Sequence, residues 1–289
     1  MYTNINELLK ICNSENIPLW KAILKNEVKL TGKTEEEIFE ELDCRYEIMV
    51  NGAKKALEKP QNTAGDLIKG VASTQYKYSN SDNTVCGYFI NNIMALALSL
   101  SEVNASMGKI CAAPTAGSCG ILPAVLIGVS EQYKLTREET LKGLLTASGI
   151  GAIVVRNATV SGAEGGCQAE CGVAAAMAAC AVVEMRGGTP EMACDAFSLA
   201  LSNCMGLVCD PIAGLVQVPC AQRNASQSIN AVISADMILG GMKFLIPPDE
   251  VLEAMYKVGT HLPTELRETA EGGIAATPTG KKIEKIIFA

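Results

Sequence analysis

The sequence predicts a mainly helical protein with a single catalytic domain and its metal ligands on loops at helix ends. Apolar residues make up 48% of the 289 residues and aromatic residues only 4%, so Ala, Leu, Ile, Val and Met must form the core. Alanine and leucine favour helices, whereas sheets are enriched in aromatic and β-branched residues. About ten segments have helical patterning, and neither a strand–turn–strand unit nor strand–helix alternation is evident.

The first 80 residues are predicted to be a helical support region. Short amphipathic helices are expected over residues 4–12 and 17–28. Thr34 and Glu37 have capping-box spacing, which predicts a third helix that ends near Leu57, before Pro60. No residue in this region suggests chemistry, so we assign the functional residues to the region 81–289.

Further helices are predicted by the same signals. A polar stretch over 75–83 leads into an apolar helix over 85–103, and another helix follows Gly120. Thr136 and Glu139 form a second capping box, whose helix should continue to about residue 155. Helices are also expected over 172–185, 190–205, 220–242 and 248–259, and residues 261–289 are expected to form a tail.

Charge and cysteine content restrict the functional class. The net charge of −7 argues against a nucleic-acid or anionic-membrane partner, because both require a basic face. No signal peptide is evident, and no uncharged apolar run reaches the ~18–20 residues of a membrane span. Twelve cysteines without a secretion signal indicate a reducing, cytoplasmic setting, where some of the thiols are expected to bind metal.

The stretch Glu164–Gly172 combines two cysteines, two glutamates and glycines directly before an Ala-rich helix, and this pattern suggests a metal site. No Cys-x-x-Cys pair or ferredoxin-type run occurs, so the ligands must come from distant loops. Spacing alone leaves Cys167 and Cys171 as alternatives. Seven cysteines lie in or near irregular segments: Cys111, Cys119, Cys167, Cys171, Cys204, Cys209 and Cys220. The others are expected to fill the core.

Residues 114–120 place a proline, glycines, hydroxyls and a thiol at the start of a helix. Backbone N–H groups at such a position bind anions such as a carboxylate. A tight interhelical turn is an equally good interpretation of this loop.

Three long stretches resemble the iron–sulfur-dependent L-serine dehydratase family in its two-chain form. They are residues 113–124 (APTAGSCGILPA), 161–172 (SGAEGGCQAECG) and 209–224 (CDPIAGLVQVPCAQRN), and the tail segment 267–275 (RETAEGGIA) matches as well. The resemblance covers most of residues 85–280 and corresponds to the catalytic alpha chain.

The resemblance implies a [4Fe–4S] cluster held by Cys167, Cys209 and Cys220, with one iron left open, and a separate beta subunit as partner. It also implies that Cys171 is not a ligand. Single-chain relatives have a terminal cysteine that can cap the open iron, and this sequence ends in Phe-Ala without one. Many relatives have Asn where Ala116 stands, so a side-chain contact there is expected to be missing.

The implied reaction is α,β-elimination from L-serine, which gives pyruvate and ammonia. Cluster iron would bind the substrate carboxylate and hydroxyl. No lysine lies in a recognisable pyridoxal phosphate context, so that cofactor is not expected. Candidates for the catalytic acid or base are His261, Lys109, Ser118, Glu164 and Glu170. Candidate substrate-binding residues are Pro114, Thr115, Ala116, Gly117, Ser118, Cys119, Arg223 and Asn224.

Three alternatives remain open at this point. A related iron–sulfur lyase would act on L-cysteine or L-threonine. A redox or electron-transfer protein would use an iron–sulfur cluster without catalysing elimination. A structural zinc protein would use the same thiols with no substrate.

Overall fold

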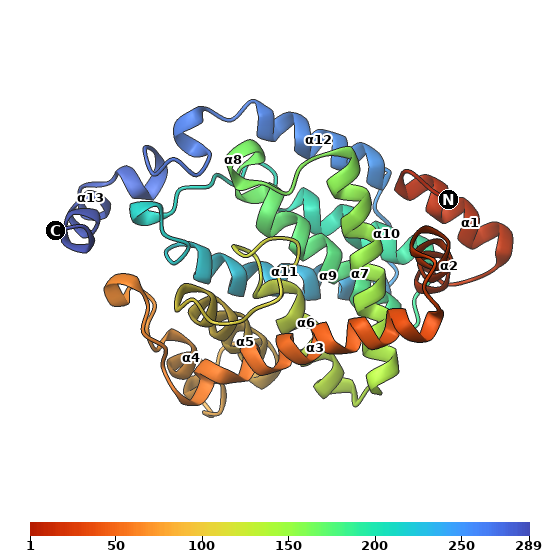
Figure 1. Cartoon of the computed structure of the whole chain (residues 1–289), viewed down its shortest axis with the longest axis horizontal. Helices are drawn as coiled ribbons and strands as arrows, with labels where there is room; N and C mark the ends of the chain where they lie inside the picture. The colour runs from red at the N-terminus through yellow and green to blue at the C-terminus, as the bar shows by residue number, and fades with distance from the viewer.

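The computed structural model describes residues 1–289 and confirms the predicted all-helical class. About 70% of the residues are helical and no strand is present. The helices are α1 Ile5–Glu15, α2 Leu19–Thr31, α3 Glu35–Glu58, α4 Val71–Ser79, α5 Gly87–Ala105, α6 Ile121–Tyr133, α7 Arg137–Asn157, α8 Gly162–Gly165, α9 Val173–Met185, α10 Pro190–Ser202, α11 Cys220–Leu239, α12 Pro248–Thr260 and α13 Pro278–Ile287. α1 and α13 lie at opposite ends of the long axis (Figure 1).

Helix α9 lies at the centre of the fold (Figure 1). Every one of its residues is buried except Glu184, which is partly buried, and it packs against α6, α7, α10 and α11. A single cluster of 70 buried hydrophobic residues extends from Tyr2 to Met255. The N-terminal helices therefore share one core with the rest of the chain.

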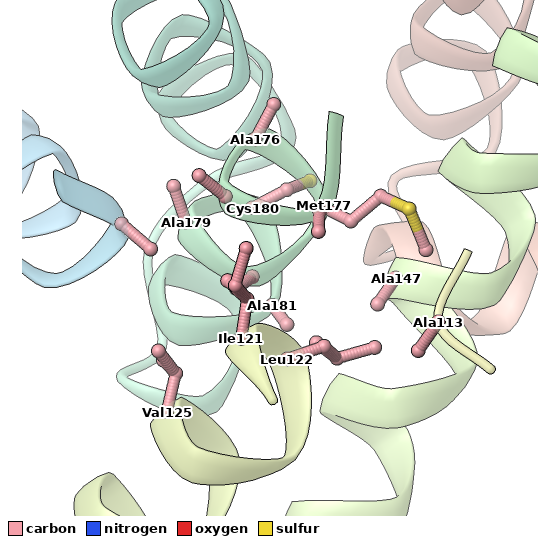
Figure 2. Close-up of a cluster of buried hydrophobic side chains, with 14 of the residues drawn as sticks. Ala113, Ile121, Leu122, Val125, Ala147, Ala176, Met177, Ala179, Cys180 and Ala181 are labelled. Carbon is pink, nitrogen blue, oxygen red and sulfur yellow. The ribbon is translucent and has the colours of Figure 1, made fainter. Parts of the chain in front are cut away.

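Small residues allow the central helices to approach closely. Figure 2 shows Ala181 of α9 beside Ile121 of α6, and the Met177 side chain of α9 extending toward Ala147 of α7. On α7, a methyl group at Gly143 would lie 2.5 Å from the Met185 side chain, and one at Gly149 would lie 2.6 Å from Ile23. Such distances are too short for real contacts, so glycine at these positions sets the spacing between helices.

Both predicted capping boxes are confirmed. The Thr34 and Thr136 side chains each accept the backbone N–H three residues on, and Glu37 and Glu139 accept the backbone N–H of the capping threonine. The helices expected over 190–205 and 220–242 end earlier, at Ser202 and Leu239.

The sequence-based prediction missed three α-helices, namely α4, α8 and α13. It also missed the π-helical turn Gln168–Gly172 and the short 3-10 helices. α13 begins with Thr277 as its N-cap and Pro278 in its first turn, which is the signal that correctly predicted the start of α10. The expectation of a plain tail over 261–289 was therefore wrong.

One helical segment, Gln168–Met185, is long and apolar enough to cross a membrane, but 89% of it is buried inside the structure. It spans the π-helical turn and α9, and its apolar side chains face the neighbouring helices of the core.

Candidate active site

Three cysteine-bearing segments meet beside the N-terminal end of α9. Cys167 lies between α8 and the π-helical turn, Cys209 lies in the loop between α10 and α11, and Cys220 is the first residue of α11. The backbone N–H of Gln168 donates to the Leu207 carbonyl at 3.1 Å, which joins the first segment to the second. Burial raises the pKa of Cys209 far above its ordinary value, and the charges of Cys167 and Cys220 raise it further. The Arg223 side chain of α11 donates to the Val208 carbonyl at 2.7 Å, which joins the second segment to the helix that begins with Cys220.

The environment distinguishes Cys167 from Cys171. The pKa of Cys167 is lowered, mainly by a hydrogen bond from Cys171 and also by the positive charge of Arg223. The pKa of Cys171 is raised well above its ordinary value by that same hydrogen bond and by burial. Of the two thiols, Cys167 is the one on which the positive charge of Arg223 acts, and that charge favours its thiolate form. Burial raises the pKa of Cys220 to about 12, with a further contribution from the Cys167 charge.

Two carboxylates approach the same point. Ligand atoms of Glu170, Cys209 and Glu268 all lie within 4.8 Å of one another, and Glu170 Oε2 lies 4.0 Å from Cys209 Sγ. Burial raises the pKa of Glu170 to about 7, while a hydrogen bond from Thr115 opposes this shift. A methyl group at Gly162 would lie 2.7 Å from Glu170 Oε2 and 3.1 Å from Cys209 Sγ, so the glycine leaves room for both groups.

The loop before α6 faces Glu170. Thr115 Oγ1 donates to Glu170 Oε1 at 2.9 Å and lies 3.0 Å from Ser118 Oγ. Gly117 brings its backbone so close that a methyl group there would lie 3.1 Å from Glu170 Oε1. Ser118 and Cys119 are fully buried, whereas Ala116 is exposed. Thr115 and Gly117 are thus the predicted loop residues closest to the carboxylate.

Asn224 fixes this loop to α11. Its Oδ1 accepts the Gly120 N–H at 2.9 Å, and its Nδ2 donates to the carbonyls of Gly117 at 2.7 Å and Cys220 at 2.9 Å. The side chain is only 1% exposed. Asn224 therefore connects the candidate substrate loop directly to a cysteine-bearing residue.

Three predicted catalytic residues lie outside this cluster of side chains. His261 is exposed, and its Nδ1 pairs with the Lys257 carbonyl of its own helix at 2.6 Å. Glu164 is exposed and accepts a hydrogen bond from Thr159. Lys109 is exposed, and its carbonyl lies next to Gly52 on α3. None of the three makes a hydrogen bond or ion pair with Glu170 or a cysteine of the site.

Asp210 and Glu268 lie in the site but were not predicted. Asp210 is 2% exposed and pairs with Arg223 at 2.8 Å. The Glu268 N–H donates to the Cys209 carbonyl at 2.7 Å. The only sequence feature that pointed to Glu268 was the tail segment 267–275, which resembles the family but from which no site residue was predicted.

Comparison with known proteins identifies the family of the chain. Residues 14–275 match the family model described as serine dehydratase alpha chain. The "L-serine dehydratase, alpha chain" of Peptoniphilus asaccharolyticus is 50% identical over 285 residues, which cover 99% of this chain and 98% of that protein. "L-serine dehydratase TdcG" of Escherichia coli (strain K12) is 35% identical over 95% of this chain, which covers 61% of that longer protein. The "L-serine dehydratase" of Mycobacterium bovis is 36% identical with the same coverage. The chain belongs to the serine dehydratase alpha chain family.

Proposed function

We propose that this chain is the catalytic alpha chain of an L-serine dehydratase, a lyase that converts L-serine to pyruvate and ammonia by α,β-elimination. The observation that carries the proposal is end-to-end similarity at 50% identity to a protein named as that alpha chain. The convergence of three cysteine-bearing segments with a buried carboxylate supports it independently.

Cys167, Cys209 and Cys220 would hold a [4Fe–4S] cluster. These thiols suit that group because Cys167 and Cys209 are buried, Cys220 is partly buried, and the positive charge of Arg223 lies beside Cys167; iron–sulfur clusters are bound by cysteine thiolates. When bound, the cluster would supply Lewis-acid stabilisation of the substrate carboxylate and of the departing hydroxide. A competing donor set of Glu170, Cys209 and Glu268 has mostly hard oxygen ligands and suits a single divalent ion better.

Glu170 is the residue that we assign to proton transfer. It is the only predicted catalytic carboxylate whose oxygens contact both the loop before α6 and a proposed ligand, at 2.9 Å from Thr115 and 4.0 Å from Cys209. A general base must lie within reach of the proton that it removes, and this geometry favours Glu170 over His261, Lys109 and Glu164.

The loop of residues 114–119 is proposed to bind the serine carboxylate or amine. Thr115, Ala116 and Gly117 are the members with surface open to solvent or facing Glu170. Ser118 orients Thr115, and Pro114 and Cys119 support the loop from the core side. Arg223 and Asn224 act by holding the ligand-bearing segments in place.

A separate beta subunit is the proposed partner. The Escherichia coli relative is a longer protein, of which this chain covers 61%, and the Peptoniphilus relative bears an alpha-chain name. We further propose that the enzyme works in the cytoplasm, that residues 81–289 carry the active site, and that residues 1–80 support it.

The proposal is tested by anaerobic turnover of L-serine, L-threonine and L-cysteine by this chain, with and without its partner chain. Pyruvate should form from serine faster than keto acid forms from threonine or sulfide from cysteine. A dominant release of sulfide would identify a cysteine lyase instead. Reversible one-electron reduction without turnover of any of the three amino acids would identify a redox protein.

A further inference from the structure

Arg223 connects the segments that carry two of the proposed ligands. Its Nη1 donates to the Val208 carbonyl at 2.7 Å, and its Nη2 pairs with Asp210 Oδ1 at 2.8 Å. Arg223 therefore contacts the residues on both sides of Cys209. Arg223 follows Cys220 by three residues on α11, and residues three apart share one helix face. The Cys209 loop is therefore fastened to the first turn of the helix that begins with Cys220.

Asp210 extends this connection to the tail. Its Oδ2 accepts the Ile274 N–H at 2.7 Å. Gly273 has φ +57°, and a methyl group there would lie 2.1 Å from Asp210 Oδ2, so only glycine leaves room for the carboxylate. The tail also pairs with Cys209 itself, whose N–H donates to the Leu266 carbonyl at 2.9 Å.

The third ligand-bearing segment is joined through Gln168, which follows Cys167. Its backbone N–H donates to the Leu207 carbonyl at 3.1 Å, and its Oε1 accepts the Gly206 N–H at 3.0 Å. Gly206 and Leu207 directly precede Val208, which Arg223 holds. A single chain of contacts thus runs from the segment of Cys167 through the Cys209 loop to α11 and to the tail.

We propose that Arg223, Asp210 and Gly273 form a positioning clamp that holds Cys167, Cys209 and Cys220 at the spacing required for cluster binding. This inference rests on the proposed function, because it assigns the clamp to the cluster that the three cysteines would hold. Arg223 is suited to the task because two separate nitrogens of its planar guanidinium each reach one acceptor in a fixed geometry, which the single nitrogen of a lysine does not provide. None of these residues needs to touch the substrate.

Gly273→Ala provides the sharpest test, with Gly214→Ala as the matched control. Gly214 also has a positive φ, of +67°, and lies between Cys209 and Cys220, but a methyl group there meets nothing within 4 Å. Both variants incur the same kind of backbone strain, and only Gly273→Ala displaces Asp210. Arg223→Lys serves as a second variant that keeps the charge and loses the two-pronged contact.

Two readouts are measured on anaerobically purified full-length protein. The first is cluster retention, as iron and sulfide per chain during incubation with an iron chelator. Gly273→Ala and Arg223→Lys should lose the cluster about 10–100-fold faster than wild type, a range typical of residues that orient metal ligands, while Gly214→Ala should match wild type. The second is the rate at which iodoacetamide alkylates Cys209 in cluster-free protein, which should rise in the two clamp variants only.

The proposal would be overturned if both clamp variants kept the cluster as long as wild type does and if their Cys209 were alkylated at the wild-type rate. Equal changes in Gly214→Ala would also overturn it, since they would show that backbone strain in these loops is sufficient. If wild-type protein binds no iron or sulfide, the proposed function fails, and the alkylation readout still decides whether the clamp holds the Cys209 loop.

Discussion

At the scale of single residues, the two cysteines of the Gly-rich stretch have different chemistry although they are four residues apart. Both are buried, and the pKa of Cys167 is lowered by its interaction with Cys171 and by the nearby Arg223 charge. A thiolate is the form that binds metal. The sequence could not separate the two from their spacing, because the difference depends on a tertiary interaction, that of Cys167 with Arg223 of α11.

Replacing Cys167, Cys209 or Cys220 by Ala should in each case abolish serine turnover and remove the iron, because each replacement deletes one of three thiolates. Cys180→Ala is the matched control, since Cys180 is fully buried in α9 and lies outside the site. Cys171→Ala should retain measurable activity, with a loss of no more than about 10–100-fold, as for a group that orients a ligand. If Cys171→Ala lost all activity and iron while Cys167→Ala kept its full iron content, Cys171 rather than Cys167 would be the ligand.

At the scale of elements, the site depends on irregular backbone at helix ends. The π-helical turn Gln168–Gly172 lies directly between Cys167 and α9, and it carries Glu170 toward the site while Cys171 stays in the core. Turns of this type are frequent at functional sites. Capping boxes were predictable because they depend on residues three apart, whereas a π-turn depends on tertiary packing and has no comparable local signal.

The anchoring of the substrate loop to α11 gives a stability prediction. Asn224→Ala leaves the buried Gly120 N–H and the Gly117 carbonyl without their partner, so the free energy of unfolding should fall by about 2–4 kcal/mol. Urea unfolding of cluster-free protein measures this change. Asn224→Asp is a second variant: it keeps an acceptor for the Gly120 N–H but places a buried carboxylate oxygen against the carbonyls of Gly117 and Cys220, so it should also lower the free energy of unfolding. A change below about 0.5 kcal/mol in Asn224→Ala would contradict an anchoring role.

The contact between α2, α7 and α9 predicts a pH dependence. Burial raises the pKa of Glu184 above its ordinary value of 4.5, although bonds from the Trp20 N–H and Thr146 partly oppose the shift. Because the pKa of Glu184 is higher in the folded than in the unfolded protein, its protonated form favours the folded state. This contribution to the free energy of unfolding is complete below pH 4.5 and is lost as the pH rises through the folded pKa.

Glu184→Gln removes this titration. The stability of wild type should therefore fall relative to that of Glu184→Gln as the pH rises from about 4 to about 7. Urea unfolding of the two cluster-free proteins at each pH measures the difference between their free energies of unfolding. Parallel stability curves for the two proteins would show that Glu184 ionises equally well in the folded and unfolded states.

At the scale of the whole molecule, one core unites segments that are distant in the chain, and the site exists only because of that core. The helical class and most helix boundaries followed from composition, capping residues and apolar periodicity. The sequence did not predict that the segments of Cys167, Cys209 and Cys220 lie together beside tail residues 266–274. This arrangement depends on how α9, α11 and α12 pack. Glu268 and Gly273 were missed for the same reason, since their partners Cys209 and Asp210 lie more than fifty residues away, and Asp210 was missed with them because it pairs with both Arg223 and the tail.

The most direct test of the account is the determination of iron and acid-labile sulfide in anaerobically purified protein. Three thiolates that hold a [4Fe–4S] cluster predict about four iron and four sulfide per chain. Stoichiometric zinc, or a single metal ion without sulfide bound by Glu170, Cys209 and Glu268, would contradict the account.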